Sequence, residues 1–306
     1  MTLPDGRLLG WATYGSPEGF PLLFFHGFPT SRLELSPADS IARRNDIKLI
    51  ALDRPGFGLS TFQPNRRILD WPEDVRAFAR HTNLNRFAIM GGSGGGPYAL
   101  ACAHSLPPEM MSAVGVMSGA GPWEAGMRED MPLTAYTIAG AAAYCPRPFS
   151  LLSDALVGTL RWVATTGPAI KRLDALLDEL EKRYKVPDKV KAPDDEKLTK
   201  EERREQFLRI CFDGFAQGSK GFVQESRLLS RNWGFKFEDI PFNGVKLFHG
   251  TLDKNAPIRT ARYIAERVPN SILREYETDN HYSMGNHVEE IMLEVLGRDP
   301  TDTKGR

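Results

Sequence analysis

The stretch from Arg86 to Leu100 reads RFAIMGGSGGGPYAL, an apolar run that stops at glycines around one serine and continues as a segment rich in alanine and leucine. This order predicts a strand, a sharp turn and a helix. Gly91-x-Ser93-x-Gly95 matches the nucleophile elbow, whose strained serine tolerates only small neighbours. Pro97 supports the helix, because a proline in the first helical turn loses no hydrogen bond. The stretch therefore predicts a Ser93 hydroxyl lifted clear of a sheet.

The same glycines allow two other interpretations. They can form no more than a tight connection, and Gly94-x-Gly96-x-x-Ala99 also fits a relaxed dinucleotide-binding fingerprint. Dinucleotide binding requires an acidic residue at the end of the following strand. The next strand-like run, AVGVM at 113–117, continues as SGAG without a carboxylate. The sequence therefore predicts no cofactor.

Length and composition are typical of a globular protein with a substantial core. The chain has 306 residues, 41% of them hydrophobic, which suits one large α/β domain with an insertion. Its 39 basic residues balance 39 acidic ones, so we expect a small neutral molecule as partner, no nucleic acid and no membrane. Three scattered cysteines and the lack of a secretory signal predict a cytoplasmic protein. No metal site is predicted, and the oligomeric state is left open.

Strand and helix patterns alternate through the first part of the chain. Weak alternation over residues 7–14, followed by turn residues at 15–19, predicts an antiparallel strand pair at the start. The alternation that follows predicts an α/β fold with a doubly wound, mostly parallel sheet. Its expected strands are residues 21–25, 47–52, 86–90 and 113–117, and its clearest helix is residues 71–80.

Helical periodicity replaces this rhythm from about Pro122 to about Gly234. We therefore predict an inserted helical cap at residues 122–234 and a core domain at 1–121 and 235–306. Phe28, Trp123 and Met127 are expected to line a substrate pocket. Residues 185–204, crowded with charges and two prolines, predict a solvated connection within the cap.

Three loops that follow expected strands carry chemistry. His26-Gly27-Phe28 follows the strand at 21–25, which makes the Phe28 N–H a candidate oxyanion donor. The sheet pattern resumes at 244–250, and Asp253 lies just beyond that strand. His281 follows the next strand, at 271–276. Because parallel strands end at one edge of a sheet, these residues are expected to converge with Ser93.

The order Ser93, Asp253, His281 is that of a serine hydrolase triad on an α/β sheet. The chain closely resembles the α/β-hydrolase superfamily in its form with a cap, over nearly everything except the cap. The resemblance implies Ser93 as nucleophile, His281 as general base, and Asp253 as the residue that orients it. It also implies an oxyanion hole made by the N–H groups of Phe28 and Gly94. The matching motifs are His26-Gly27-Phe28-Pro29, Asp53-Arg54-Pro55-Gly56-Phe57-Gly58, the elbow, Gly250-x-x-Asp253-x-x-x-Pro257 and His281.

Other residues compete for these roles. Glu124 occupies a second position at which this superfamily places the acid, and His249 and His287 are alternatives for the base. Asp53 can be catalytic, although a carboxylate in a turn so rich in proline and glycine more commonly braces its own loop.

Departures from the patterns of relatives narrow the predicted function. The HGFP segment lacks the extra glycine of prolyl aminopeptidases, and a serine at the elbow argues against dehalogenases and epoxide hydrolases, which use aspartate there. The hypothesis is a serine hydrolase that cleaves an ester, a lactone or a related acyl bond, thioesters and carbon–carbon bonds included, of a mostly apolar small molecule. The alternatives are a ligand receptor without turnover and a lyase or isomerase of secondary metabolism on the same fold.

Overall fold

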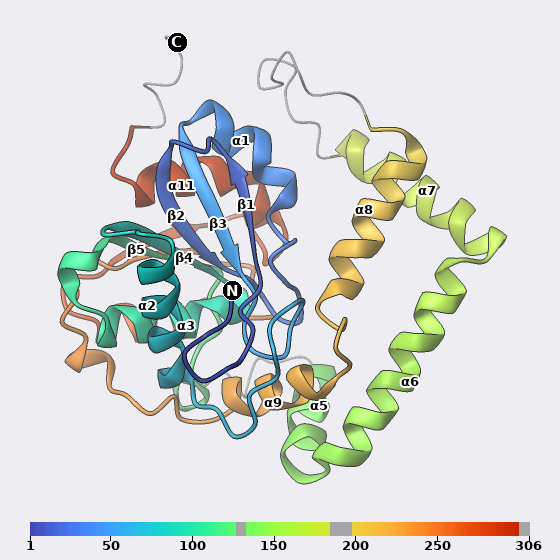
Figure 1. The fold of residues 1–306 in the computed structure, drawn as a ribbon, viewed down its shortest axis with the longest axis horizontal. Coiled ribbons are helices and arrows are strands. Elements are labelled where there is room, and N and C mark those ends of the chain that lie inside the picture. The colour runs from blue at the N-terminus through green and yellow to red at the C-terminus, as the bar shows by residue number, and fades with distance from the viewer. Residues whose placement is uncertain (127–132, 184–197, 300–306) are drawn as a thin grey trace.

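A seven-stranded sheet organises the protein in the computed structural model, which describes residues 1–126, 133–183 and 198–299 (Figure 1). The strand order is β1-β3-β2-β4-β5-β6-β7. β1 is antiparallel to its neighbour and every other pair is parallel. The predicted mostly parallel sheet is thus confirmed. The strands are β1 (Trp11–Gly15), β2 (Phe20–Phe25), β3 (Ile47–Leu52), β4 (Phe87–Gly92), β5 (Met111–Met117), β6 (Lys246–Gly250) and β7 (Ile272–Tyr276).

The predicted pairing of the first two strands with each other is wrong. β1 lies antiparallel to β3, with Trp11 opposite Leu52, whereas β2 lies between β3 and β4. The side chains of β2 from Leu22 to Phe25 are all buried, and a strand covered on both faces belongs in the interior of a sheet. β1 is only half-buried and forms the edge.

Helices cover both faces of the sheet, as a doubly wound fold requires. On one face, α2, α3 and α10 pack against alternate strand residues such as Leu23 and Ile89. On the other face, α1 and α11 pack against the intervening residues, such as Phe24 and Met90. These helices are α1 (Asp39–Arg44), α2 (Trp71–His81), α3 (Gly96–Ser105), α10 (Ile258–Ala265) and α11 (Val288–Val295).

A helical insertion separates β5 from β6. It comprises α5 (Leu133–Tyr144), α6 (Pro146–Ala164), α7 (Gly167–Arg183), α8 (Lys200–Asp213) and α9 (Lys220–Leu229). The solvated connection expected at 185–204 is wrong for its last part, because α8 begins at Lys200 behind a capping box of Thr199 and Glu202. Residues 184–197 lie outside the described residues. None of the described helices is long and apolar enough to span a bilayer.

Candidate active site

Ser93 lies at the turn between β4 and α3, in the strained position that its glycine neighbours permit. Its φ of 48° is in the left-handed region, which residues with a side chain seldom adopt. A Cβ at Gly95 would lie 2.0 Å from the Phe25 carbonyl oxygen, and one at Gly91 would lie 2.5 Å from the Gly95 carbonyl oxygen. Both flanking glycines are therefore required by sterics, as the elbow pattern predicts.

The structure brings Ser93, His281 and Asp253 into one hydrogen-bonded series. His281 Nε2 lies 3.0 Å from Ser93 Oγ, and His281 Nδ1 lies 2.7 Å from Asp253 Oδ2. The other carboxylate oxygen of Asp253 accepts hydrogen bonds of 2.8 Å from the N–H groups of Asn255 and Ala256. Asp253 is thereby fixed with one oxygen directed at the imidazole. This arrangement can move a proton from the serine to the histidine.

The competing residues make other contacts. His249 is buried with Nε2 2.6 Å from the Ala256 carbonyl oxygen and 3.5 Å from Asp253 Oδ2, and its burial lowers its pKa. His287 lies 3.1 Å from a carboxylate oxygen of Asp279. Glu124 is exposed in a short 3-10 helix, whereas the Nδ1 of His281 meets Asp253. The carboxylate that contacts His281 is thus the one predicted from its place after β6.

The loop after β2 lies against the elbow. A Cβ at Gly94 would lie 3.2 Å from the Phe28 nitrogen, so the backbones of the two predicted oxyanion donors are close together. Gly94 also stands just before α3, where backbone N–H groups favour an anion. Phe28 stacks on Phe222, with ring centroids 5.1 Å apart. The loop is therefore packed between the core and the helical insertion.

Sequence reasoning missed Glu34, a carboxylate that supports this loop. It accepts a 2.5 Å hydrogen bond from the Gly27 N–H and another from the Thr30 hydroxyl. Burial raises the pKa of Glu34, against the opposing effect of these hydrogen bonds. A Cβ at Gly92 would lie 3.7 Å from its carboxylate, which places Glu34 within ordinary contact distance of the residue before the nucleophile. No pattern in the sequence pointed to Glu34.

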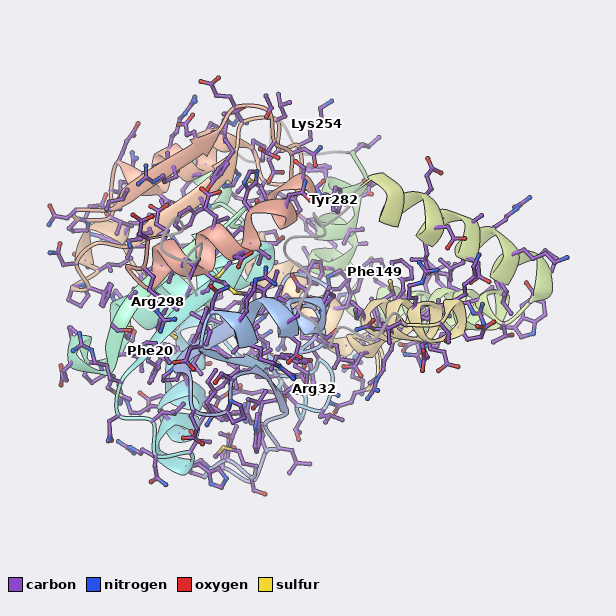
Figure 2. All side chains as sticks on the ribbon, turned by 90° about the horizontal axis from the view of Figure 1, so that it is seen from above. Phe20, Arg32, Phe149, Lys254, Tyr282 and Arg298 are labelled. Atoms are coloured by element: carbon purple, nitrogen blue, oxygen red, sulfur yellow. The ribbon has the colours of Figure 1, made fainter. Side chains whose placement is uncertain are left out.

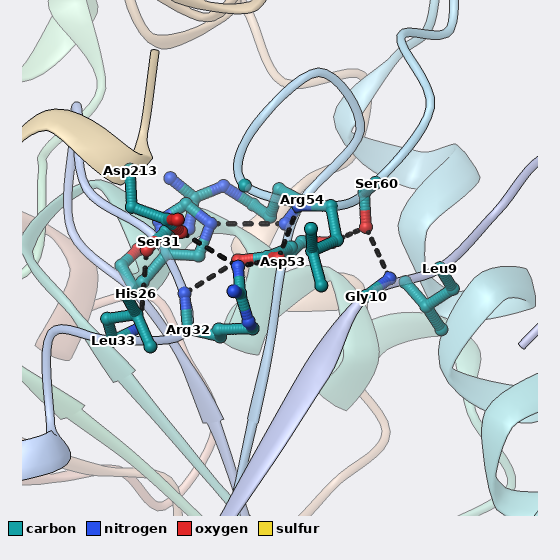
Figure 3. Close-up of polar contacts among 12 residues, drawn as sticks. Leu9, Gly10, His26, Ser31, Arg32, Leu33, Asp53, Arg54, Ser60 and Asp213 are labelled. Atoms are coloured by element: carbon teal, nitrogen blue, oxygen red, sulfur yellow. Dashed lines mark hydrogen bonds and ion pairs between the residues drawn. The ribbon is translucent and has the colours of Figure 1, made fainter. Parts of the chain in front are cut away.

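Asp53 braces its own loop, as its setting in the sequence predicts (Figure 3). It is buried and accepts hydrogen bonds from the Arg32 N–H at 2.7 Å, the Arg32 guanidinium at 2.8 Å and the Leu59 N–H at 2.8 Å. Arg32 also pairs at 2.7 Å with Asp213, at the end of α8. The cluster joins the helical insertion to the carboxyl edge of the sheet.

His26 is held in its neutral form by its partners. Its Nε2 accepts a 3.1 Å hydrogen bond from the Arg54 N–H, and its Nδ1 lies 2.8 Å from the Gly27 carbonyl oxygen. A proton on Nε2 would remove the acceptor that the Arg54 N–H requires. Burial and the Arg54 charge accordingly hold the pKa of His26 well below its usual value.

This low pKa predicts a loss of stability in acid. Unfolded histidine binds a proton near pH 6.5 and folded His26 does not, so the free energy of unfolding should fall as pH drops below that value. Glutamine can also donate and accept a hydrogen bond, but it does not bind a proton. His26→Gln is therefore expected to lose about 1 kcal/mol less of its free energy of unfolding between pH 6 and pH 5 than the wild type loses. Urea unfolding at each pH measures it. An equal loss of unfolding free energy in both proteins would contradict the assignment of His26 as neutral in the folded state. Between pH 7 and pH 8 the difference in unfolding free energy between the two proteins should stay constant.

An apolar cavity opens above Ser93. Its volume is about 290 Å³, and it lies between the sheet edge and helices α5 and α9. Phe28 and Trp123, two of the residues predicted for the substrate pocket, line this cavity, while Met127 lies outside the described residues. Among the described lining residues, His281 is the only one with a titratable nitrogen, and none carries a carboxylate. Besides the residues already named, these are Gly94, Ala120, Ala135, Ile138, Ala139, Ser226, Leu229, Ser230, Asn255 and Tyr282.

Comparisons with known proteins agree with this architecture. A serine hydrolase-like protein of Danio rerio is 32% identical over 117 residues, which are 37% of this chain and 35% of that protein. A proline iminopeptidase of Arabidopsis thaliana is 28% identical over 120 residues, 37% of this chain and 30% of that one. The matched segment thus spans about a third of the length of these curated relatives.

Solved structures match over nearly the whole chain. An esterase from Exiguobacterium antarcticum has a TM-score of 0.65 at 15% identity, covering 97% of this chain and 98% of that one. The enol-lactonase from Burkholderia xenovorans LB400 has a TM-score of 0.62 at 15% identity, covering 97% and 99%. At such identities these likenesses concern the fold alone. The family model described as alpha/beta hydrolase fold matches residues 21–288, a range that contains Ser93, Asp253 and His281. The chain therefore belongs to the α/β-hydrolase family.

Proposed function

We propose that the protein is a serine hydrolase that cleaves a carboxylic ester, a lactone or a related acyl bond of a mostly apolar small molecule. One observation carries the proposal: His281 lies between Ser93 and Asp253 beside an apolar cavity. Its Nε2 is 3.0 Å from Ser93 Oγ, and its Nδ1 is 2.7 Å from Asp253 Oδ2. A serine hydroxyl becomes a nucleophile only when a neighbouring base accepts its proton.

In the proposed reaction, Ser93 Oγ attacks the acyl carbon while its proton passes to His281 Nε2. Asp253 orients the imidazole and stabilises the imidazolium. The N–H groups of Phe28 and Gly94 bind the developing oxyanion. His281 then gives the proton to the leaving alcohol, and an acyl group remains on Ser93. Water activated by His281 releases the acid and restores the serine.

The cavity supports a neutral substrate. Its described lining residues contribute apolar groups, hydroxyls, one amide, the Trp123 indole and the His281 imidazole, and no carboxylate that would pair with an ammonium group. An aminopeptidase would need such a partner for the amino terminus of its substrate, because a buried unpaired charge is costly. Esters are therefore favoured over the amino-terminal peptides that the names of two curated relatives suggest.

Hydrolysis of p-nitrophenyl esters from acetate to octanoate tests the proposal, with L-proline p-nitroanilide as the comparison substrate. The expected result is turnover of the esters, together with loss of turnover when a fluorophosphonate modifies Ser93, located by peptide mass spectrometry. Preferential cleavage of the anilide would instead indicate an aminopeptidase. Ligand binding without turnover would indicate a receptor. A product that has not gained the elements of water would indicate a lyase or an isomerase.

The helical insertion is proposed to act as a cap that selects the acyl chain. Trp123 lines the cavity and stacks on Tyr136 of α5, with ring centroids 6.3 Å apart. Trp123→Ala is expected to change the ratio of kcat/KM between short and long acyl chains by about 1 to 3 kcal/mol, because the cavity gains apolar volume. Steady-state kinetics across the ester series measures this ratio. An equal loss of kcat/KM for every ester would contradict a role of Trp123 in selecting the acyl chain. Ser93 of the variant should still react with a small phosphonate.

A further inference from the structure

Helices α6, α7 and α8 form an arm that stands off to one side of the sheet (Figures 1 and 2). We use "the arm" for the described residues 146–183 and 198–213. Among the described side chains of residues 143–180 and 198–222, nothing larger than serine is buried. Buried apolar side chains stop at Ala142 and resume at Val223. The arm therefore has no apolar core of its own.

The longest helix of the arm exposes its apolar side chains and buries its small polar ones. In α6 the buried residues are Ser150 and Ser153, whereas Leu152 is 67%, Leu156 57% and Leu160 47% exposed. Helices in proteins owe most of their stability to an apolar face packed against another element. The pattern of α6 therefore indicates a face that another surface covers.

The same face is hollowed. A groove of about 540 Å³ between α6, α7 and α8 is lined by Leu156, Leu160, Val163, Leu173, Cys211 and Phe212, among others. Several charged residues of α7 and α8 join these helices to each other. Asp178 pairs with Lys200 at 2.7 Å and with Arg203 at 2.8 Å, and Asp174 pairs with Arg204 at 2.7 Å. The apolar side chains are left to line the open groove.

We propose that this face of the arm is the contact between two copies of the chain. The exposed parts of Leu152, Leu156, Leu160 and Val163 present on the order of 300 Å² of apolar surface on α6, and the groove walls on α7 and α8 add to it. One side of a standard dimer interface buries about 800 Å², of which somewhat over half is apolar. A two-fold axis sets the same patch of both copies against each other, so a single contact covers both exposed faces. The inference concerns a surface and is independent of the chemistry at Ser93.

The charges of the arm favour a second copy over a lipid surface. Helices that lie on membranes carry lysine and arginine along a polar face beside the apolar one. The charged residues of α6 are Arg147, Asp154 and Arg161. Asp154 accepts a 2.7 Å hydrogen bond from the Ser219 N–H, and Arg161 donates at 2.9 Å to the Phe212 carbonyl oxygen. Asp154 and Arg161 are thus engaged within the protein, and Arg147 is a single basic residue in the first turn of α6, so this helix lacks the row of basic residues that a membrane-bound helix carries. A face without charges meets its own copy without repulsion.

Sedimentation velocity of the full chain at about 1 to 100 μM tests the proposal. The wild-type protein is expected to be a dimer. Leu156→Glu should raise the dissociation constant at least ~30-fold, because it places two carboxylates in an apolar contact. Leu8→Glu is the matched control, since Leu8 is 54% exposed and lies on the core, and it should leave the dissociation constant unchanged.

A second readout uses the wild-type chain and the cysteines it already has. Cys211 lines the groove and Cys145 is exposed outside it. Maleimide labelling of Cys211 should accelerate when the protein is diluted below its dissociation constant, while the rate at Cys145 should not change. This measurement stands even if Leu156→Glu does not fold.

Three results would overturn the proposal. One is a wild-type chain that sediments as a monomer over the whole range. Another is a monomer that co-sediments with phosphatidylcholine vesicles, which would assign the face to lipid. The third is a dimer that Leu156→Glu and Leu8→Glu leave equally intact, which would place the interface elsewhere.

Discussion

Replacing Ser93 by alanine is expected to lower kcat for p-nitrophenyl ester hydrolysis by roughly 10⁴- to 10⁶-fold, the range found when a triad nucleophile is removed. The reason is geometric. Ser93 Oγ is the hydroxyl 3.0 Å from His281 Nε2, and alanine leaves the imidazole with no nucleophile to activate. Steady-state kinetics measures the loss, and circular dichroism checks that the variant is folded.

Ser230→Ala is the control for this prediction. Ser230 lines the same cavity but is not part of the Ser93, His281 and Asp253 series, so its substitution also removes a serine hydroxyl from the cavity. Its kcat is expected to stay within about tenfold of the wild-type value, because a single neutral hydrogen bond contributes about 1 kcal/mol. Activity retained by Ser93→Ala and lost by Ser230→Ala would refute the proposed nucleophile.

Replacing Glu225 by alanine is expected to lower the free energy of unfolding by about 3 to 5 kcal/mol, the cost of leaving buried charges without their partner. Glu225 of α9 is completely buried and pairs with Arg54 at 2.8 Å and with Arg66. It also accepts a 2.7 Å hydrogen bond from the Tyr98 hydroxyl. Without it, two guanidinium groups remain buried and unneutralised. Equilibrium urea unfolding measures the change.

Glu275→Ala supplies the comparison. Its partner Arg262 lies 2.6 Å away, but both side chains are substantially exposed, so the expected change is about 0 to 1 kcal/mol. If both substitutions lowered the free energy of unfolding equally, burial would not be the reason that Glu225 stabilises the fold.

The contribution of Glu225 to the free energy of unfolding should also depend on pH. Burial raises the pKa of Glu225, but the charges of Arg54 and Arg66 and the hydrogen bonds outweigh it, and the pKa is lowered. A carboxylate with a lowered folded pKa stabilises the fold above its unfolded value and loses that contribution as pH falls through the folded one. The stability difference between wild type and Glu225→Ala should therefore narrow below about pH 4.5.

Local patterns predicted the elements around the active site because each depends on neighbours in the chain. The glycines at 91 and 95 are required by contacts within one turn and with the adjacent strand, so the strand, elbow and helix around Ser93 were predictable. Asp253 and His281 were predictable from their positions after strands, because parallel strands end at one edge. Their roles in catalysis stay predictions that the kinetics above will test.

Contacts between distant segments were not predictable from such patterns. The turn at 15–19 suggested a hairpin, yet β1 pairs with β3, because the buried strand β2 takes the interior position. Glu34 accepts a hydrogen bond from the Gly27 N–H and lies within contact distance of Gly92, an arrangement that depends on three separate segments.

The sequence by itself determined the class of fold, the strained turn at Ser93 and the order of the residues that meet it, since periodicity and turn chemistry act over a few residues. Only the tertiary structure decided that His281 contacts Asp253, that Glu225 neutralises Arg54 from 171 residues away, and that the arm bears its leucines outward. Those outcomes depend on which surfaces bury one another, and burial is a property of the packed chain as a whole.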